Sequence, residues 1–132
     1  MAKGITPDQL AKSGSEHGHQ RAVMQWAAQN MQHWPALRWL FAIPNGGGRS
    51  AAQAAMLKAE GVKRGVSDLM LPVPRGGYHG LFIEMKKGIG VPSDVSKEQR
   101  EFLAFVHENG YRAEVAFGWQ RAVEILEHYL GS

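Results

Sequence analysis

The sequence predicts an α/β domain in which helices flank a mixed central sheet. Segments with the three-four apolar spacing of amphipathic helices alternate with short apolar runs that are typical of strands. Their order along the chain is helix, strand, helix, strand, strand, helix, strand, helix, which favours one mixed sheet. The 132 residues, 44% of them hydrophobic, are enough for one core and too few for two full domains. The fold and any active site must therefore share a single domain.

The first part of the chain is predicted to hold an arm, a helix and a strand. Residues 1–12 show no convincing periodicity and are expected to form a loose arm, which leaves 13–132 as the domain. From Ser13 to about residue 33, apolar residues recur at helical spacing, and following this stripe backwards leads to Glu16. Residues 37–43 are predicted to form a short strand that ends at a turn rich in proline and glycine.

A helix over residues 50–59 is predicted next, followed by a β-hairpin with strands at 67–73 and 80–86. A Pro-Arg-Gly-Gly turn separates the two strands. Residues 88–94, with two glycines and a proline, are expected to form a mobile loop that could close over a substrate. The predicted elements that complete the chain are a helix from Ser96 to Gly110, a strand over 111–117 and a helix over 119–130.

The composition excludes several kinds of site and favours an anionic partner. The chain has no cysteine, which excludes disulfides, cysteine zinc sites and a cysteine nucleophile. A formal charge of +3, a pI of about 9.4 and basic residues concentrated in the middle of the chain favour a polyanion. The sequence shows no signal-peptide pattern and no apolar stretch long enough to cross a bilayer. We therefore expect no membrane contact and a cytoplasmic location.

Two carboxylates and a lysine on the predicted hairpin are the candidate catalytic residues. Asp68 begins one strand and Glu84 ends the other, and in an antiparallel pair these positions can be neighbours. Lys86 points to the same face as Glu84, where its ammonium group could orient or polarise an attacking water. The side chain of Met85 points into the core, but its backbone carbonyl could serve as a further oxygen ligand. Hard cations such as Mg²⁺ or Mn²⁺ prefer oxygen ligands and promote phosphodiester hydrolysis.

Each of these patterns also has a purely structural interpretation. A Glu-x-Lys pair on a strand is often only a solvated face. Glu16 and Gln99 match capping boxes that begin at Ser13 and Ser96, in which the third helical residue hydrogen-bonds to the backbone of the cap. Both residues also begin the inward faces of their helices. On the residues alone, either role stays open.

Five motifs follow one another along the chain: Ile43 to Arg49, Lys58 to Asp68, Phe82 to Lys86, Ser96 to Gln99, and Gly110 with Tyr111. This ordered set resembles the VRR-NUC family, a branch of the PD-(D/E)xK nucleases, over roughly residues 15–130. The resemblance implies a restriction-endonuclease-like PD-(D/E)xK core and a metal-dependent nuclease. It also implies that Glu16, Asp68 and Glu84 bind the Mg²⁺ or Mn²⁺, that Lys86 is the catalytic lysine and that Gln99 supports the site.

The resemblance further implies DNA as the substrate. The chain is similar to the compact, stand-alone phage and bacterial members, which resemble Holliday-junction resolvases in forming homodimers. Structure-selective cleavage of branched DNA is the activity that this implies. A general nicking or restriction-like endonuclease, or a DNA-binding module without catalysis, remains an alternative. The side chains expected to contact DNA are Asn45, Arg49, Lys63, Arg64 and Lys87.

The sequence departs from the family pattern at two positions. Lys63 stands where the Val-Arg-Arg run that names the family has its first arginine, and Ser67 replaces the usual proline before Asp68. The lysine keeps the positive charge but loses the guanidinium fork, which affects phosphate contacts more than catalysis. Neither departure removes a predicted metal ligand.

Overall fold

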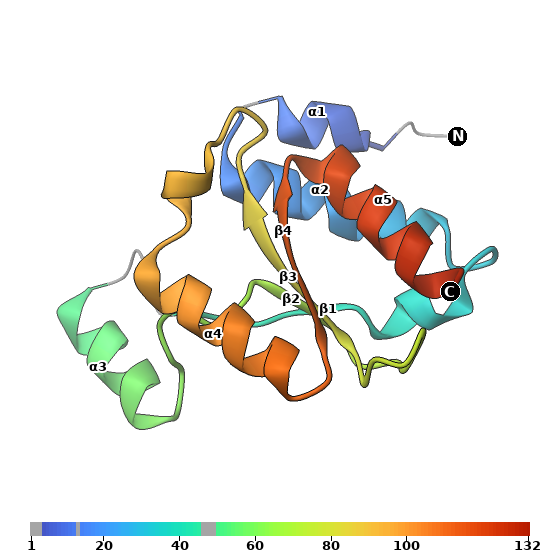
Figure 1. Cartoon of the computed structure of the whole chain (residues 1–132). Coiled ribbons are helices and arrows are strands. Elements are labelled where there is room, and N and C mark those ends of the chain that lie inside the picture. The colour runs from blue at the N-terminus through green and yellow to red at the C-terminus, as the bar shows by residue number, and fades with distance from the viewer. Residues whose placement is uncertain (1–3, 13, 46–49) are drawn as a thin grey trace.

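A computed structural model of the chain describes residues 4–12, 14–45 and 50–132 (Figure 1). The helices are α1 Pro7–Ala11, α2 Glu16–Gln29, α3 Ala51–Ala59, α4 Lys97–Glu108 and α5 Trp119–Leu130. The strands are β1 Phe41–Ala42, β2 Leu69–Leu71, β3 Leu81–Lys86 and β4 Arg112–Phe117, and two 3-10 turns span Pro35–Trp39 (η1) and Pro92–Asp94 (η2).

The four strands form one mixed sheet in the order β1-β2-β3-β4. The β1–β2 and β2–β3 pairs are antiparallel, whereas β3 and β4 are parallel and are connected through α4. The predicted hairpin is confirmed, with Leu69 opposite Ile83 and Leu71 opposite Leu81. The predicted mixed sheet flanked by helices is therefore the observed architecture.

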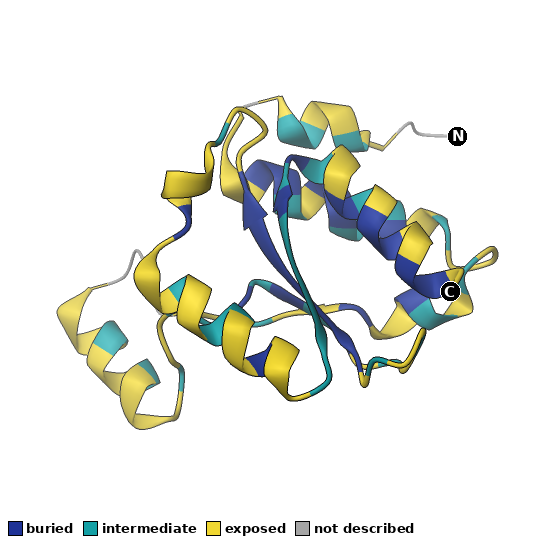
Figure 2. Ribbon diagram, viewed as in Figure 1, coloured by how far each residue is buried: buried dark blue, intermediate teal, exposed yellow. Residues whose placement is uncertain are grey.

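Strand β3 lies at the centre of the molecule, and all six of its residues are buried (Figure 2). Its side chains alternate between the two faces of the sheet, as in any strand. Leu81, Ile83 and Met85 belong to the apolar core, together with residues of α2 and α5. Phe82 points the other way and makes an edge-to-face contact with Phe102 of α4. The polar residues Glu84 and Lys86 share the face of Phe82, which places them beside α4 rather than in the apolar core.

The N-terminal region departs from the predicted loose arm and from the predicted helix limits. Residues Pro7–Ala11 form α1, because Thr6 and Gln9 make a capping box and Pro7 suits the first helical turn. The prediction of a loose arm is therefore wrong for this segment, which packs against α2. Helix α2 begins after Ser15, whose hydroxyl accepts a hydrogen bond from the amide of Gly18 at 3.0 Å. Ser13, the predicted start, lies outside the described residues.

The predicted strand over residues 37–43 is only partly confirmed. Pro35–Trp39 forms a 3-10 turn, and only Phe41–Ala42 joins the sheet. Helix α3 has the predicted limits and is capped by Ser50. None of the residues of α3 is buried, and the helix projects from the rest of the molecule (Figures 1 and 2). The last helix, strand and helix agree with the prediction within two residues at each end.

Candidate active site

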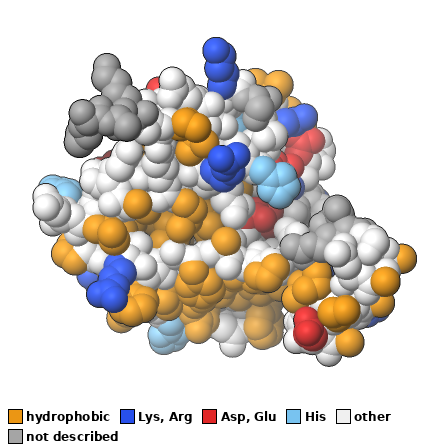
Figure 3. Space-filling model, turned by 180° about the vertical axis from the view of Figure 1, so that it is seen from behind, with side chains coloured by type: hydrophobic (Ala, Val, Ile, Leu, Met, Phe, Trp, Pro, Cys, Tyr) orange, Lys and Arg blue, Asp and Glu red, His pale blue; other side chains and the backbone are white. Residues whose placement is uncertain are grey.

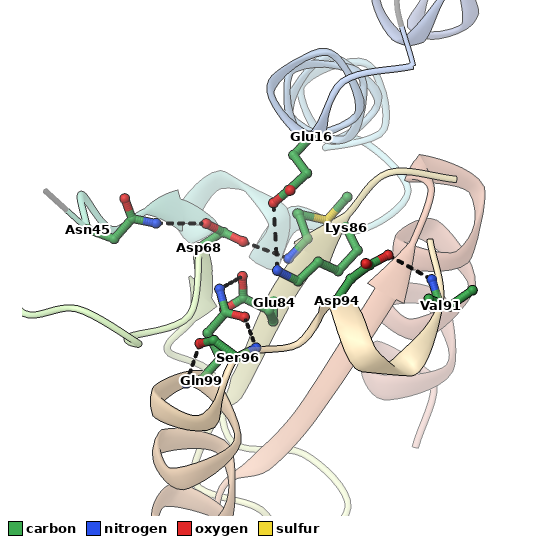
Figure 4. A network of polar contacts seen from close by, with 10 residues as sticks. Glu16, Asn45, Asp68, Glu84, Lys86, Val91, Asp94, Ser96 and Gln99 are labelled. Carbon is green, nitrogen blue, oxygen red and sulfur yellow. Dashed lines mark hydrogen bonds and ion pairs between the residues drawn. The ribbon is translucent and has the colours of Figure 1, made fainter. Parts of the chain in front are cut away.

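The hairpin register brings Asp68 and Glu84 together at one end of the sheet (Figure 4). Asp68 directly precedes β2, and its carbonyl accepts a hydrogen bond from the amide of Ile43 at 2.8 Å. Its carboxylate oxygen Oδ2 accepts a hydrogen bond from the amide of Met85 at 2.7 Å. Asp68 is therefore fixed against β3 by its side chain and against the end of β1 by its backbone.

Gln99 connects Glu84 to the start of α4. Its side-chain nitrogen Nε2 donates a hydrogen bond to Glu84 Oε2 at 3.1 Å. Its side-chain oxygen accepts a hydrogen bond from the amide of Ser96 at 2.8 Å, and the Ser96 hydroxyl accepts one from the amide of Gln99 at 3.1 Å. The capping box and the contact with Glu84 coexist, because the two ends of one amide group serve the two purposes.

Glu16 approaches the same site from the first turn of α2. Its Oε1 lies 3.9 Å from Nζ of Lys86, and the Glu16 side chain is 51% exposed whereas that of Lys86 is 7% exposed. Because Ser15 caps α2, Glu16 is the first helical residue and not the third residue of a capping box. The capping interpretation of Glu16 is therefore wrong, and its carboxylate is free to face the lysine.

Burial and crowding of carboxyl groups raise the pKa of Glu84 to about 9. The loss of water around the buried side chain is the largest cause, followed by a hydrogen bond with Asp68 and repulsion from its charge. The Lys86 ammonium opposes this rise, and the charge of Glu16 adds a smaller increase. Without a cation, Glu84 therefore carries a proton at neutral pH.

The donor set fits a hard divalent cation. Glu84 is 1% exposed, and its Oε1 is buried without a hydrogen-bond donor among the described residues. An orphaned carboxylate oxygen beside a second carboxylate is a poor arrangement for protein alone and a suitable one for a metal with oxygen ligands. In the part of the chain that is described, no three acidic or histidine side chains form a complete metal cluster, and the Glu16 carboxylate lies 3.9 Å from the Lys86 ammonium group.

The amide of Asn45 points toward the acidic pair and donates a hydrogen bond to Asp68 Oδ1 at 3.4 Å. Beside it lies a cavity of about 440 Å³ whose charged lining residues are Lys58, Lys63 and Arg64. A second cavity of about 250 Å³ is lined by Asn45, Arg64 and Gln99 among others, so one basic residue shares a cavity with the residues that contact Asp68 and Glu84. Lys63 lines the larger cavity together with Asn45 and Arg64.

For the other two residues expected to contact DNA, these cavities give no support. Lys87 is exposed directly after β3, and Arg49 lies outside the described residues. Lys58 lines the larger cavity although the sequence interpretation did not assign it to DNA. The sequence contained one indication of this role. Lys58 lies near the end of the predicted helix, and Lys63 and Arg64 follow in the next loop, so the three side chains can share a surface.

The structure thus brings an acidic pair and a lysine together on the central hairpin of a mixed sheet. The VRR-NUC domain matches residues 6–119, and the chain belongs to the VRR-NUC family. A solved structure described as a VRR_NUC domain protein is similar, with a TM-score of 0.70 and 29% sequence identity. That match covers 98% of this chain and 92% of the other. No curated protein matches the chain.

Membership of a nuclease family supports the conclusion that the protein is a DNA nuclease and therefore a hydrolase. Among the described residues, none of the helices is long and apolar enough to span a membrane.

Proposed function

We propose that this chain is an endonuclease that hydrolyses DNA phosphodiester bonds with Mg²⁺ or Mn²⁺. The observation that carries the proposal is the buried Glu84 paired with the half-buried Asp68 beside Lys86, with one Glu84 oxygen lacking a donor among the described residues. With a pKa of about 9, Glu84 holds a proton at neutral pH, and this proton relieves the repulsion between the carboxyl groups of Glu84 and Asp68. A bound cation would relieve the same repulsion.

Asp68 and Glu84 are the proposed central ligands of the cation, with Glu16 and the backbone carbonyl of Met85 completing the set. The bound ion neutralises charge on the phosphoryl oxygens and acidifies the attacking water. The amide of Met85 holds the Asp68 carboxylate, and Gln99 holds that of Glu84, so neither ligand has to reorganise. This rigidity is what a preorganised site requires.

Lys86 is the proposed catalytic lysine. Its ammonium group lies beside Glu16 and is nearly excluded from solvent, so its charge acts on a nearby phosphate with little screening by water. From this position it orients the nucleophilic water and stabilises the negative charge that develops on the phosphoryl group.

Asn45, Lys63, Arg64 and Lys87 are the proposed DNA contacts, and Lys58 joins them because it lines the same cavity. Arg49 is included on its sequence position. Basic side chains next to the acidic pair hold a phosphate backbone across the cation site through charge rather than base sequence. We propose that this cleavage takes place in the cytoplasm.

Branched DNA is the proposed preferred substrate and a homodimer the proposed form, both by similarity to the compact members of the family. Exposed hydrophobic side chains support a dimer, because they gather across the lower half of the face shown in Figure 3. A dimer would present two sites to two strands of a junction.

The deciding experiment compares cleavage of a four-way junction with a linear duplex of matched sequence, with Mg²⁺, with Mn²⁺ and with a chelator. We expect metal-dependent cleavage that is faster on the junction. Equal cleavage of both DNAs would favour the nicking or restriction-like alternative. Binding without cleavage in either metal would favour the inactive module, and light scattering of the purified protein decides the oligomeric state.

A control variant, Glu84→Ala, separates this activity from a contaminating nuclease. The variant removes a proposed ligand and should leave no metal-dependent cleavage of either DNA. Cleavage at the wild-type rate would refute the assignment of the site.

A further inference from the structure

Ile89 is the most exposed of the large hydrophobic side chains in the described residues, with 87% of its surface open to solvent. It lies at the tip of the turn that leaves β3, between Lys87 and Gly90. The amide of Gly90 donates a hydrogen bond to the carbonyl of Lys87 at 3.0 Å, which closes this turn. An isoleucine held in water at the tip of a tight turn gains no burial from folding, and the exposed Val91 two residues further adds apolar surface to the same segment, so this surface is available to a partner.

The two glycines beside Ile89 pack the turn tightly against the body of the protein. A Cβ atom on Gly90 would lie 2.7 Å from the ring of Phe117, which ends β4. A Cβ atom on Gly88 would lie 3.5 Å from the ring of His19 on α2. The backbone on both sides of Ile89 therefore lies against neighbouring elements. Gly90 leaves no room for a side chain, whereas a Cβ atom at Gly88 would reach only ordinary contact distance.

The following turn is also closed. Val91 donates its amide hydrogen to Asp94 Oδ2 at 2.8 Å, and the amide of Asp94 donates to the carbonyl of Val91 at 2.8 Å (Figure 4). Pro92 restricts the backbone between them. These contacts do not favour the expected mobile loop over residues 88–94, because two hydrogen-bonded turns and two glycine contacts hold the segment in place.

The tip lies close to the proposed cleavage site. Ile89 lies three positions after Lys86, and a fully extended chain covers about 3.3–3.6 Å per residue, so the two Cα atoms are within about 11 Å. Bases in a duplex are spaced about 3.4 Å apart along one strand. A DNA strand that runs from Lys86 toward this turn would therefore reach Ile89 within about three bases of the cut.

We propose that Ile89 is a wedge that inserts between stacked bases next to the scissile phosphate. Apolar side chains used in this way unstack a base step and bend the DNA, and they work best when the protein does not have to be ordered first. The exposed Lys87 beside the tip supplies the phosphate contact that draws the strand against it. This inference rests on the proposed nuclease function and adds a reason for a preference for branched DNA, whose bases at the branch are already partly unstacked.

The test compares Ile89→Ala with wild type on two duplexes that differ only at the mapped wild-type cut. One duplex is fully paired, and the other carries a two-base mismatch at the same step. We expect Ile89→Ala to cut the paired duplex about tenfold more slowly and the mismatched duplex within about twofold of wild type, since the mismatch supplies the unstacking. Ile5→Ala, which shortens another exposed isoleucine, is the matched control and should cut both DNAs at the wild-type rate.

A second measurement reports on the bases directly. In proteins that also carry Glu84→Gln, which keeps the DNA intact, 2-aminopurine placed at the cut should brighten on binding only when Ile89 is present. Restoration of this signal by Ile89→Leu would support a wedge that needs bulk and not a specific shape.

Three outcomes would overturn the inference. Equal rates of Ile89→Ala and wild type on the paired duplex would exclude the wedge while leaving the nuclease intact. An equal loss on paired and mismatched DNA would show that Ile89 acts in some way other than by unstacking. If the wild-type protein cuts neither DNA in any metal, the proposed function fails, and the inference fails with it.

Discussion

The acidic and basic parts of the site are built in opposite ways. Asp68 and Glu84 are held by hydrogen bonds from Met85 and Gln99, on a hairpin whose central strand is buried along its whole length. The basic side chains come from α3, which has no buried residue, and from the loop that follows it. The protein therefore fixes the groups that handle the reacting phosphate and leaves exposed the groups that gather the DNA.

This contrast predicts different consequences for substitutions in the two parts. Changes in the acidic part should alter the rate of the chemical step, because they disturb a preorganised site. Changes in the basic part should alter DNA affinity and its dependence on salt, because exposed charges act through the phosphate backbone.

The largest effect is expected from Asp68→Ala. It removes a proposed ligand and the acceptor of the Met85 amide, and we expect at least about a thousandfold loss of cleavage with little loss of DNA binding. Single-turnover cleavage and a filter-binding titration measure the two quantities. If the variant cuts within tenfold of the wild-type rate, Asp68 does not belong to the site. Circular dichroism of the variant checks that the fold is retained.

Gln99→Ala tests whether the amide acts on Glu84 or only on the helix. We expect about a 10- to 100-fold loss of cleavage, as for other residues that orient a metal ligand. Ser96→Ala is the matched control because it removes the other half of the capping box without touching Glu84. It should cost about 1 kcal/mol of unfolding free energy and leave cleavage almost unchanged. Similar cleavage by the two variants would show that capping is the main role of Gln99.

The stability of the metal-free protein should fall as the pH rises from 5 to 9, and Glu84→Gln should weaken this dependence. The pKa of Glu84 is raised from 4.5 to about 9, so its stabilising contribution is complete below 4.5 and is lost as the pH passes through 9. Thermal melts of both proteins in a chelator measure the difference, for which we expect several degrees in Tm at the alkaline end. Mg²⁺ should restore the wild type more than the variant. Parallel pH curves for the two proteins would contradict the assignment of the shift to Glu84.

The smallest effect is expected from Arg64→Ala in the basic part. We expect weaker DNA binding and a fall of about one in the slope of log affinity against log salt, with an unchanged rate at saturating DNA. Titrations at several salt concentrations measure the slope, and Arg121→Ala, which changes an exposed arginine on α5, serves as the control. An unchanged slope for Arg64→Ala would place the DNA elsewhere.

The sequence was sufficient where apolar spacing and turn residues determined the structure. The hairpin follows from two apolar runs around a Pro-Arg-Gly-Gly turn, and its register then places Asp68 beside Glu84. The sequence predicted both the cap at Ser96 and the inward position of Gln99. It could not show that one amide group of Gln99 serves both the cap and the contact with Glu84.

The structure differs from the sequence-based predictions where short local signals compete. The Thr6 to Gln9 capping box specifies α1 without any apolar periodicity over so short a segment, so residues 7–11 read as an arm. Residues 37–43 have the apolar content of a strand, but Pro35 fixes the first dihedral of a 3-10 turn and shortens the strand to two residues. The burial of Glu84 and its raised pKa depend on tertiary packing around β3 and on the nearby Asp68, which no local pattern reports.

The double use of Gln99 ties the assembly of the proposed site to the completion of the domain. The same amide completes the first turn of α4 and orients the acid of β3, so a chain in which α4 has not docked lacks the contact that aligns Glu84. Under the proposed mechanism, full cutting activity then requires the finished domain, and a partly folded chain cuts DNA more slowly than the native protein.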